Sequence, residues 1–229
     1  MKHIQKNLID IRNEINEVCK SIGRDPDSVK LVAVSKTFPI EDIKVAYDDE
    51  QRLFGENRVQ ELEIKIPQLP SDIKWHLIGT LQRNKVKYIV DKVSLIHSVD
   101  SLLLAKEISK QALKKNIVVN ILLQVNIAME DTKHGFETTE IVKKIEEIKE
   151  LPGIKVRGLM TVAPAVENPE EVRLVFRKLR KLAEYIDCLG ILGIDMKELS
   201  MGMSGDFQIA IEEGATFVRV GGRIFGERY

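Results

Sequence analysis

Apolar and polar positions follow two different periods along this chain. Residues 3–20 carry apolar side chains at Ile4, Leu8, Ile11, Ile15 and Val18, which lie on one face of a helix. After this helix, short apolar runs alternate with stretches of helical period. The runs predict strands at 29–35, 53–56, 74–79, 94–99, 118–126, 155–162, 198–202 and 216–221. The stretches between them predict helices near 40–50, 57–66, 82–91, 101–115, 138–150, 169–188 and 205–213.

The helix expected at 169–188 has the clearest start. Asn168 precedes it as an N-cap, Pro169 occupies its first turn, and acidic residues come before basic ones. No linker-like or low-complexity segment interrupts the alternation, so we expect one domain over residues 1–229.

Eight strands that alternate with helices predict an α/β protein whose parallel sheet closes into a single (β/α)8 TIM barrel, preceded by an extra N-terminal helix. A doubly wound open sheet is the alternative. It normally uses fewer strands, and no G-x-G-x-x-G follows the first strand. In a barrel, chemistry takes place at the carboxyl ends of the strands.

Charge and composition narrow the class of protein. The 35 basic and 35 acidic residues balance, so we expect no nucleic-acid partner, which would need a basic surplus. No apolar run has the length of a membrane span, and we expect a cytoplasmic monomer. Cys19 and Cys188 show neither redox nor metal spacing, and we expect no metal site.

Lys36 ends the first predicted strand, in the stretch LVAVSKTFP. The ordinary interpretation is a lysine whose stem is buried and whose ammonium reaches water. The alternative is a reactive amine, since burial lowers the pKa of a lysine and the neutral amine forms Schiff bases with carbonyl compounds.

The last two strand ends favour the second interpretation. Barrels often hold a phosphate in the loops after strands seven and eight. Here these loops contain serines and glycines, whose hydroxyl and backbone N–H groups bind anions: Ser200, Gly202, Ser204, Gly205, Gly221 and Gly222. A ligand with both a carbonyl and a phosphate would satisfy both ends. Pyridoxal 5′-phosphate (PLP) fits, and so does a sugar phosphate in a class I Schiff-base aldolase.

Seven stretches together resemble the YggS/PROSC family of pyridoxal phosphate homeostasis proteins. They occur in the family's order from about residue 5 to Tyr229: LVAVSKTFP, FGENRVQE, WHLIGTLQRNK, IHSVDS, GLMTVAP, LSMGMSGD and VRVGGRIFGER. The resemblance implies a barrel like that of alanine racemase (PLP fold type III) without that enzyme's second domain.

The resemblance also implies roles for individual residues. Lys36 would hold the cofactor as a Schiff base, and Arg219 would approach the pyridine nitrogen. Ser200, Ser204, Gly221 and Gly222 would hold the phosphate, and Asn57, His76 and Met160 would line the ring. Many relatives have threonine where this chain has Gly222, so a hydroxyl contact to the phosphate is missing there.

The family resemblance implies a non-catalytic protein that stores, buffers or delivers PLP, with transient contact to PLP-dependent apo-enzymes. A weak amino-acid racemase is the alternative. Racemases supply a second acid–base tyrosine from an added domain. Here Tyr47, Tyr88 and Tyr185 fall in predicted helices and Tyr229 is the last residue, so we expect no catalytic residues.

Overall fold

The computed structural model describes residues 2–128 and 134–226. Its eight parallel strands form a closed barrel in the order β1 to β8, as the sequence predicts. The strands are β1 Lys30–Val34, β2 Leu53–Glu56, β3 Lys74–Leu77, β4 Leu95–Val99, β5 Val119–Gln124, β6 Ile154–Met160, β7 Ile194–Met203 and β8 Phe217–Val220.

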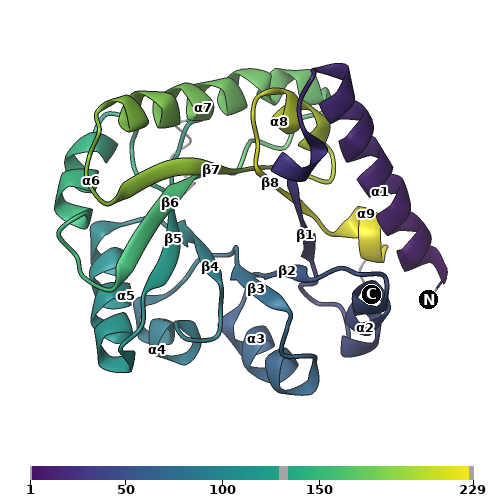
Figure 1. The fold of residues 1–229 in the computed structure, drawn as a ribbon, viewed down its shortest axis with the longest axis horizontal. Coiled ribbons are helices and arrows are strands. Elements are labelled where there is room, and N and C mark those ends of the chain that lie inside the picture. The colour runs from purple at the N-terminus through teal and green to yellow at the C-terminus, as the bar shows by residue number, and fades with distance from the viewer. Residues whose placement is uncertain (1, 129–133, 227–229) are drawn as a thin grey trace.

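Helices surround this barrel (Figure 1). The α-helices are α1 Lys2–Ser21, α2 Ile40–Asp48, α3 Val59–Lys65, α4 Val86–Ile89, α5 Leu102–Lys115, α6 Ile141–Ile148, α7 Arg173–Cys188, α8 Phe207–Glu212 and α9 Gly222–Phe225. Single 3₁₀ turns lie at Pro26–Ser28, Ile66–Gln68, Arg83–Lys85 and Pro169–Val172. The N-terminal helix α1 packs against α2, α8 and α9 and completes the outer layer on that side.

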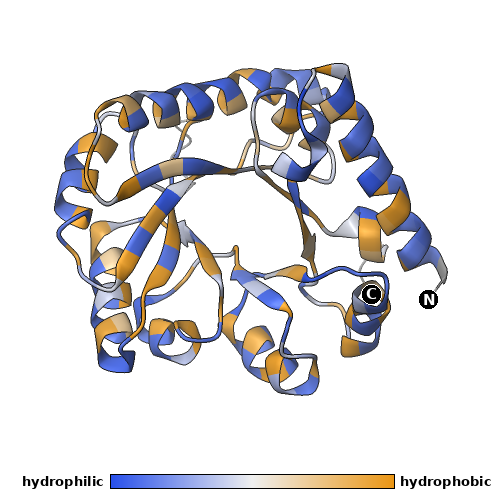
Figure 2. Cartoon of the chain, in the orientation of Figure 1, coloured by the Kyte–Doolittle hydropathy of each residue, from blue (hydrophilic) through white to orange (hydrophobic). Residues whose placement is uncertain are grey.

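The core has two parts, because each strand presents alternate side chains to the helices and to the barrel interior. The larger part lies between barrel and helices and includes Phe54, Phe176 and Phe207. The helices carry both apolar and polar positions, as a layer with one buried face requires (Figure 2). The smaller part fills the barrel with Val32, Leu95, Leu122, Met160 and Phe217.

The barrel closes where β1 pairs with β8, with Val32 opposite Arg219. Because all eight strands run in parallel, their carboxyl ends meet at one mouth and their amino ends at the other. Lys36, two residues beyond β1, therefore lies at the same mouth as the loops after β7 and β8.

Most element boundaries differ from the sequence prediction by one to three residues, and three differences are larger. Strand β7 begins at Ile194, four residues before the predicted start, because its first half pairs with β6. The helix expected near 82–91 is a 3₁₀ turn followed by the short α4. The segment 222–225, which directly follows Gly221, forms α9, which no apolar period indicated.

The N-terminal cap predicted for the helix at 169–188 is confirmed. The Asn168 side chain accepts a hydrogen bond from the Glu170 N–H, and Pro169 occupies the first position, although this first turn is 3₁₀. Among the described residues, no helix is long and apolar enough to cross a membrane.

Gly158 holds β6 and β7 together at a register irregularity. Its φ is +153°, and an added Cβ would lie 1.8 Å from the Glu198 carbonyl oxygen. We expect Gly158→Ala to lower the free energy of unfolding by at least about 3 kcal/mol, since backbone strain and overlap add. The matched control is Gly190→Ala, where φ is +61° and no atom lies within 4 Å. Urea unfolding should give a loss of only about 1–2 kcal/mol there; equal losses would contradict the close approach.

Candidate functional site

Lys36 is held at the barrel mouth by the backbone on either side of it. The residue is half-buried and follows the fully buried Ser35, while Thr37 adopts a left-handed conformation with φ 68°. Phe38 then packs against Phe225 of α9, with ring centroids 5.0 Å apart. The turn therefore fixes the direction in which the Lys36 side chain leaves the strand.

A buried ion cluster fastens the same turn to β2 and α3. The Lys65 ammonium donates to the Ser35 carbonyl oxygen at 2.9 Å, to Glu56 Oε1 at 2.7 Å and to Glu61 Oε2 at 3.0 Å. The Ser35 hydroxyl donates to Glu56 Oε1 at 2.7 Å, and the Thr37 N–H donates to Glu61 Oε2 at 2.7 Å. Both residues that flank Lys36 are thus fixed by carboxylates.

Glu56 is the member of this cluster whose carboxylate is incompletely hydrogen-bonded. Its side chain is fully buried, and its Oε2 has no hydrogen-bond partner among the described residues. Burial raises the pKa of the Glu56 carboxyl to about 7, against the opposing effect of Lys65. Sequence reasoning placed Glu56 at a strand end but assigned it no role.

The ends of β7 and β8, where the sequence predicts an anion cradle, lie at the same mouth as the end of β1. The Gly221 N–H donates to the Ser204 hydroxyl at 3.3 Å. A Cβ on Gly221 would lie 3.1 Å from the Val34 carbonyl oxygen, so the end of β8 lies directly against the end of β1. Gly222 faces open space and begins α9, where the first N–H groups have no acceptor within the helix.

Arg219 is buried in the barrel wall below this cradle, with 5% of its surface exposed. Its Nη1 donates to the Ser200 hydroxyl at 2.6 Å and its Nη2 to the Thr161 carbonyl oxygen at 2.9 Å. No carboxylate among the described residues forms an ion pair with it. Burial lowers the pKa of Arg219 to about 10, so the guanidinium remains charged at neutral pH.

Two histidines continue the contacts of Arg219 across the barrel. His97 Nδ1 lies 2.8 Å from Ser200 Oγ, and His97 Nε2 lies 2.8 Å from His76 Nδ1. Burial lowers the pKa of His76 to about 3 and that of His97 well below its ordinary value, so both rings are neutral. His97 is the residue that sequence reasoning missed; its signal was a polar ring in the apolar strand LIHSV.

The expected site residues therefore lie at two levels along the barrel axis, at the carboxyl mouth and inside the barrel. Lys36, Ser204, Gly221 and Gly222 lie at the carboxyl mouth. Ser200 is fully buried, its hydroxyl lies 2.6 Å from Arg219 and 2.8 Å from His97, and its expected phosphate contact stays a prediction.

The remaining candidates also lie apart. His76 lines two pockets at the opposite, amino-terminal mouth. Asn57 follows β2 and lines a pocket with Thr80 and Gln82, while Met160 belongs to the packed barrel interior. Their proposed contacts with the cofactor stay predictions.

The described residues contain no group of three His, Cys, Asp or Glu side chains that could hold a metal ion. Tyr47, Tyr88 and Tyr185 lie in α2, α4 and α7, as predicted, and Tyr229 lies outside the described residues.

A lysine at the end of β1 and a cradle after β7 and β8 define a barrel of the alanine racemase kind. The family model for the alanine racemase N-terminal domain matches residues 7–229. The pyridoxal phosphate homeostasis protein of Aquifex aeolicus is 47% identical over 224 residues, which cover 97% of each chain. That of Escherichia coli K12 is 37% identical and covers 100% of this chain and 98% of its own. This chain thus belongs to the pyridoxal phosphate homeostasis protein family.

Solved structures agree with this assignment. PipY of Synechococcus elongatus with PLP bound superimposes with a TM-score of 0.84 at 35% identity, covering 97% of this chain and 100% of that one. A Clostridium difficile alanine racemase shares the fold, with a TM-score of 0.73 at 19% identity. This chain covers 57% of that enzyme.

Glu56 should make stability depend on pH. Its pKa is about 7 in the folded chain against 4.5 for an ordinary carboxyl, so the folded chain binds more protons between these values. The free energy of unfolding therefore falls as pH rises from 4.5 to 7. We expect Glu56→Gln to gain stability relative to the natural chain over this range, with a slope approaching about 1.4 kcal/mol per pH unit.

Urea unfolding at pH 5, 6, 7 and 8 measures this difference. Glu61→Gln is the matched control from the same cluster, because its pKa is lowered. Its carboxylate stabilises the fold at high pH and loses that contribution as pH falls, so the control variant should show the opposite trend. A pH-independent difference for Glu56→Gln would contradict the raised pKa.

Proposed function

We propose that this chain binds pyridoxal 5′-phosphate as a Schiff base on Lys36 and acts in PLP homeostasis by storing, buffering or delivering the cofactor. The observation that carries the proposal is the pairing of the Lys36 amine with a serine–glycine cradle at one barrel mouth. The PLP-bound PipY, which matches over nearly the whole chain, supports the same ligand.

The donor groups fit each part of this ligand. Lys36 would bind the aldehyde carbon, while the Ser204 hydroxyl and the N–H groups of Gly221 and Gly222 would bind the phosphate. Arg219 is a buried cation whose two described hydrogen-bond acceptors are neutral, so it can donate to a further acceptor, and the pyridine nitrogen would supply one. Asn57 would line the ring at the end of β2.

Ser200 and His76 take a different part in this proposal. Ser200 is occupied beneath Arg219, and His76 is separated from it by His97. Both would therefore act through Arg219, by holding its guanidinium in place, and the phosphate would depend on Ser204 and the glycines.

Arg219 also bears on catalysis. PLP supplies an electron sink for carbanion chemistry when it is bound in an enzyme. A guanidinium beside the pyridine nitrogen opposes protonation there by like-charge repulsion, which weakens that sink. Arg219 is charged at neutral pH, and no described tyrosine lies at a strand end to serve as a second acid or base. We therefore propose a carrier without robust catalysis.

Weak racemisation is the second candidate, because an alanine racemase shares the barrel.

Delivery of PLP further implies transient contact with apo-enzymes. We propose a cytoplasmic monomer made of one domain, in keeping with the two free cysteines Cys19 and Cys188.

Lys36 should be the residue that is modified by PLP. Reduction of the PLP-loaded chain with borohydride should fix the adduct covalently, and peptide mass spectrometry should locate it on Lys36. Lys36→Ala should lose the visible absorption band and remain folded, since a half-buried residue beyond the strand contributes little to the core. Lys44→Ala, an exposed position on α2, is the matched control and should keep the band. An adduct elsewhere with Lys36 unmodified would overturn the assignment.

The carrier should not exchange the α-proton of amino acids at an enzymatic rate. Racemisation needs a base on one face of the α-carbon and an acid on the other, and each such group contributes about 10²–10⁴-fold. Incubation of the PLP-loaded chain with L-alanine, L-serine and L-threonine in deuterated water should give exchange near the background of free PLP. Transfer of PLP to an apo-enzyme should proceed under the same conditions. Rapid deuterium incorporation or inversion would replace the carrier with the racemase.

A further inference from the structure

The amino-terminal mouth of the barrel, opposite Lys36, is hollow and lined by charged residues. A pocket of about 770 Å³ lies between the starts of β1, β2, β3 and β8 and the helix α1. A second pocket of about 390 Å³ lies at the starts of β4 to β7. The two share His76 and Phe217 as lining residues, so both open onto the same floor.

His76 is the polar group of that floor. Its side chain is almost completely buried, with 4% of the residue exposed, and its Nδ1 is occupied by His97. Its Nε2 has no hydrogen-bond partner among the described residues, and the ring lines both pockets. A buried ring therefore presents one unused nitrogen to the amino-terminal mouth.

The contacts above His76 decide whether this nitrogen carries a proton. A guanidinium only donates, so the Ser200 hydroxyl oxygen accepts from Arg219. The described acceptor for the Ser200 hydroxyl proton is His97 Nδ1. Because a neutral imidazole has one N–H, His97 then donates through Nε2 to His76 Nδ1, and His76 carries its proton on Nε2. The chain of hydrogen bonds thus ends in a donor that points into the pocket.

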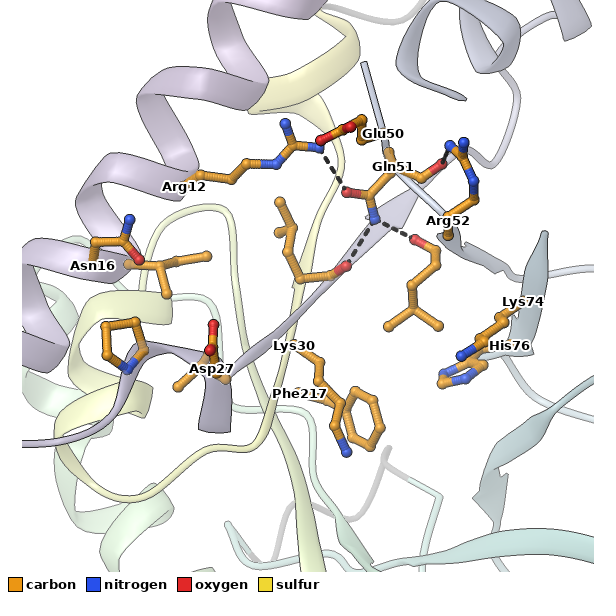
Figure 3. Close-up of a pocket in the computed structure, with 15 residues that line it drawn as sticks. Arg12, Asn16, Asp27, Lys30, Glu50, Gln51, Arg52, Lys74, His76 and Phe217 are labelled. Atoms are coloured by element: carbon orange, nitrogen blue, oxygen red, sulfur yellow. Dashed lines mark hydrogen bonds between the residues drawn. The ribbon is translucent and has the colours of Figure 1, made fainter. Parts of the chain in front are cut away.

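Two lysines surround this donor. Figure 3 shows Lys74 beside the His76 ring and Lys30 beside Phe217, across the pocket. The Lys30 ammonium lies 4.7 Å from the Phe217 ring centroid and forms an ion pair with Glu198 at 2.6 Å. Lys74 forms no ion pair with a described residue. The positive charge of both lysines acts on the His76 ring.

The two arginines of the pocket are both held in ion pairs. Arg12 pairs with Asp49 at 2.8 Å, and Arg52 pairs with Asp72 at 2.9 Å. The acidic lining residues Asp27 and Glu50 are exposed at its rim. Lys74 is thus the one lining cation without an ion pair among the described residues, and it lies beside the His76 ring, which offers its N–H to the same pocket.

We propose that the amino-terminal mouth binds a small oxyanion, a phosphate or a carboxylate, between the His76 Nε2–H and the ammonium groups of Lys30 and Lys74. Hydrogen bonds in a chain polarise one another, so an anion that accepts from His76 strengthens the donation by His97 and Ser200 behind it. The Ser200 oxygen then becomes a better acceptor for Arg219. An anion bound at the amino-terminal mouth therefore changes the hydrogen bonding of Arg219, which lies below the carboxyl mouth. This coupling rests on the proposed function, whereas the anion site does not.

The site is tested by nuclear magnetic resonance of the histidine rings during titration with inorganic phosphate, succinate or chloride at matched ionic strength. Long-range ¹H–¹⁵N spectra separate protonated from unprotonated ring nitrogens, and both His76 and His97 should carry the proton on Nε2. Phosphate or succinate should shift the His76 resonances saturably, and the arm with the lower midpoint identifies the preferred oxyanion. A His76 proton on Nδ1, or equal shifts with chloride, would overturn the proposal.

Substitutions around the pocket should change the affinity for the anion in opposite directions. Lys74→Met should weaken anion binding by about two- to fivefold, as expected for an exposed charge, and Lys74→Arg should restore it. Glu198→Gln should strengthen binding, because it releases Lys30 from its ion pair. Lys114→Met, an exposed position on α5, is the matched control and should change nothing. Equal affinity in all four variants would show that these lysines do not form the site.

The coupling is tested in the chain whose cofactor has been fixed by borohydride, so that phosphate cannot compete for the cradle. Fluorescence of the pyridoxyl group should change with the same midpoint as the His76 resonances. If the resonances shift while the fluorescence stays constant, the anion site holds and the coupling fails. If no pyridoxyl adduct forms, the proposed function fails while the His76 titration still reports on the anion site.

Discussion

The buried guanidinium of Arg219 is the constraint on which the barrel interior depends. A charge in a dry interior is costly unless its hydrogen bonds are satisfied, and no described carboxylate forms an ion pair with this one, although Asp206 attracts it at longer range. Its described acceptors are a hydroxyl and a carbonyl oxygen, and the hydroxyl is held in turn by His97. The strands β4, β6, β7 and β8 must therefore keep their register for Arg219 to remain satisfied. An interior of apolar side chains alone would leave this cation without partners.

The carboxyl mouth is built on a second set of buried charges. Lys65, Glu56 and Glu61 fix the backbone on both sides of Lys36, so its amine projects from a rigid turn. Glu56 is strained within this set, because one of its oxygens is buried without a partner. Removing Lys65 would leave Glu56 a buried charge without its ion pair, which is far more costly than the loss of an exposed pair.

The same geometry is consistent with the proposal that this alanine racemase-like barrel carries a cofactor. Lys36, Ser204 and Gly221, which are proposed to hold PLP, follow the ends of β1, β7 and β8, and these strands are neighbours in the closed sheet. In the proposed site these residues would bind and orient the ligand, and Lys36 would be their one acid–base group. A site that binds its ligand equally well in the ground state and in the transition state has affinity but does not accelerate a reaction. The proposed storage of PLP requires affinity alone.

Sequence and tertiary structure determined different parts of this protein. The alternation of strand and helix periods fixes eight parallel strands, because buried parallel strands need short continuous apolar runs. Lys36 and the glycines after the last strand were recognisable for the same reason, since polar residues directly after such runs must lie at a barrel mouth. Only the tertiary structure brought His76, His97, Ser200 and Arg219 into one chain of contacts. These residues lie on four strands, up to 143 positions apart between His76 and Arg219 (219 − 76). Strand register in the closed barrel decides which of them touch, and no local period encodes that register.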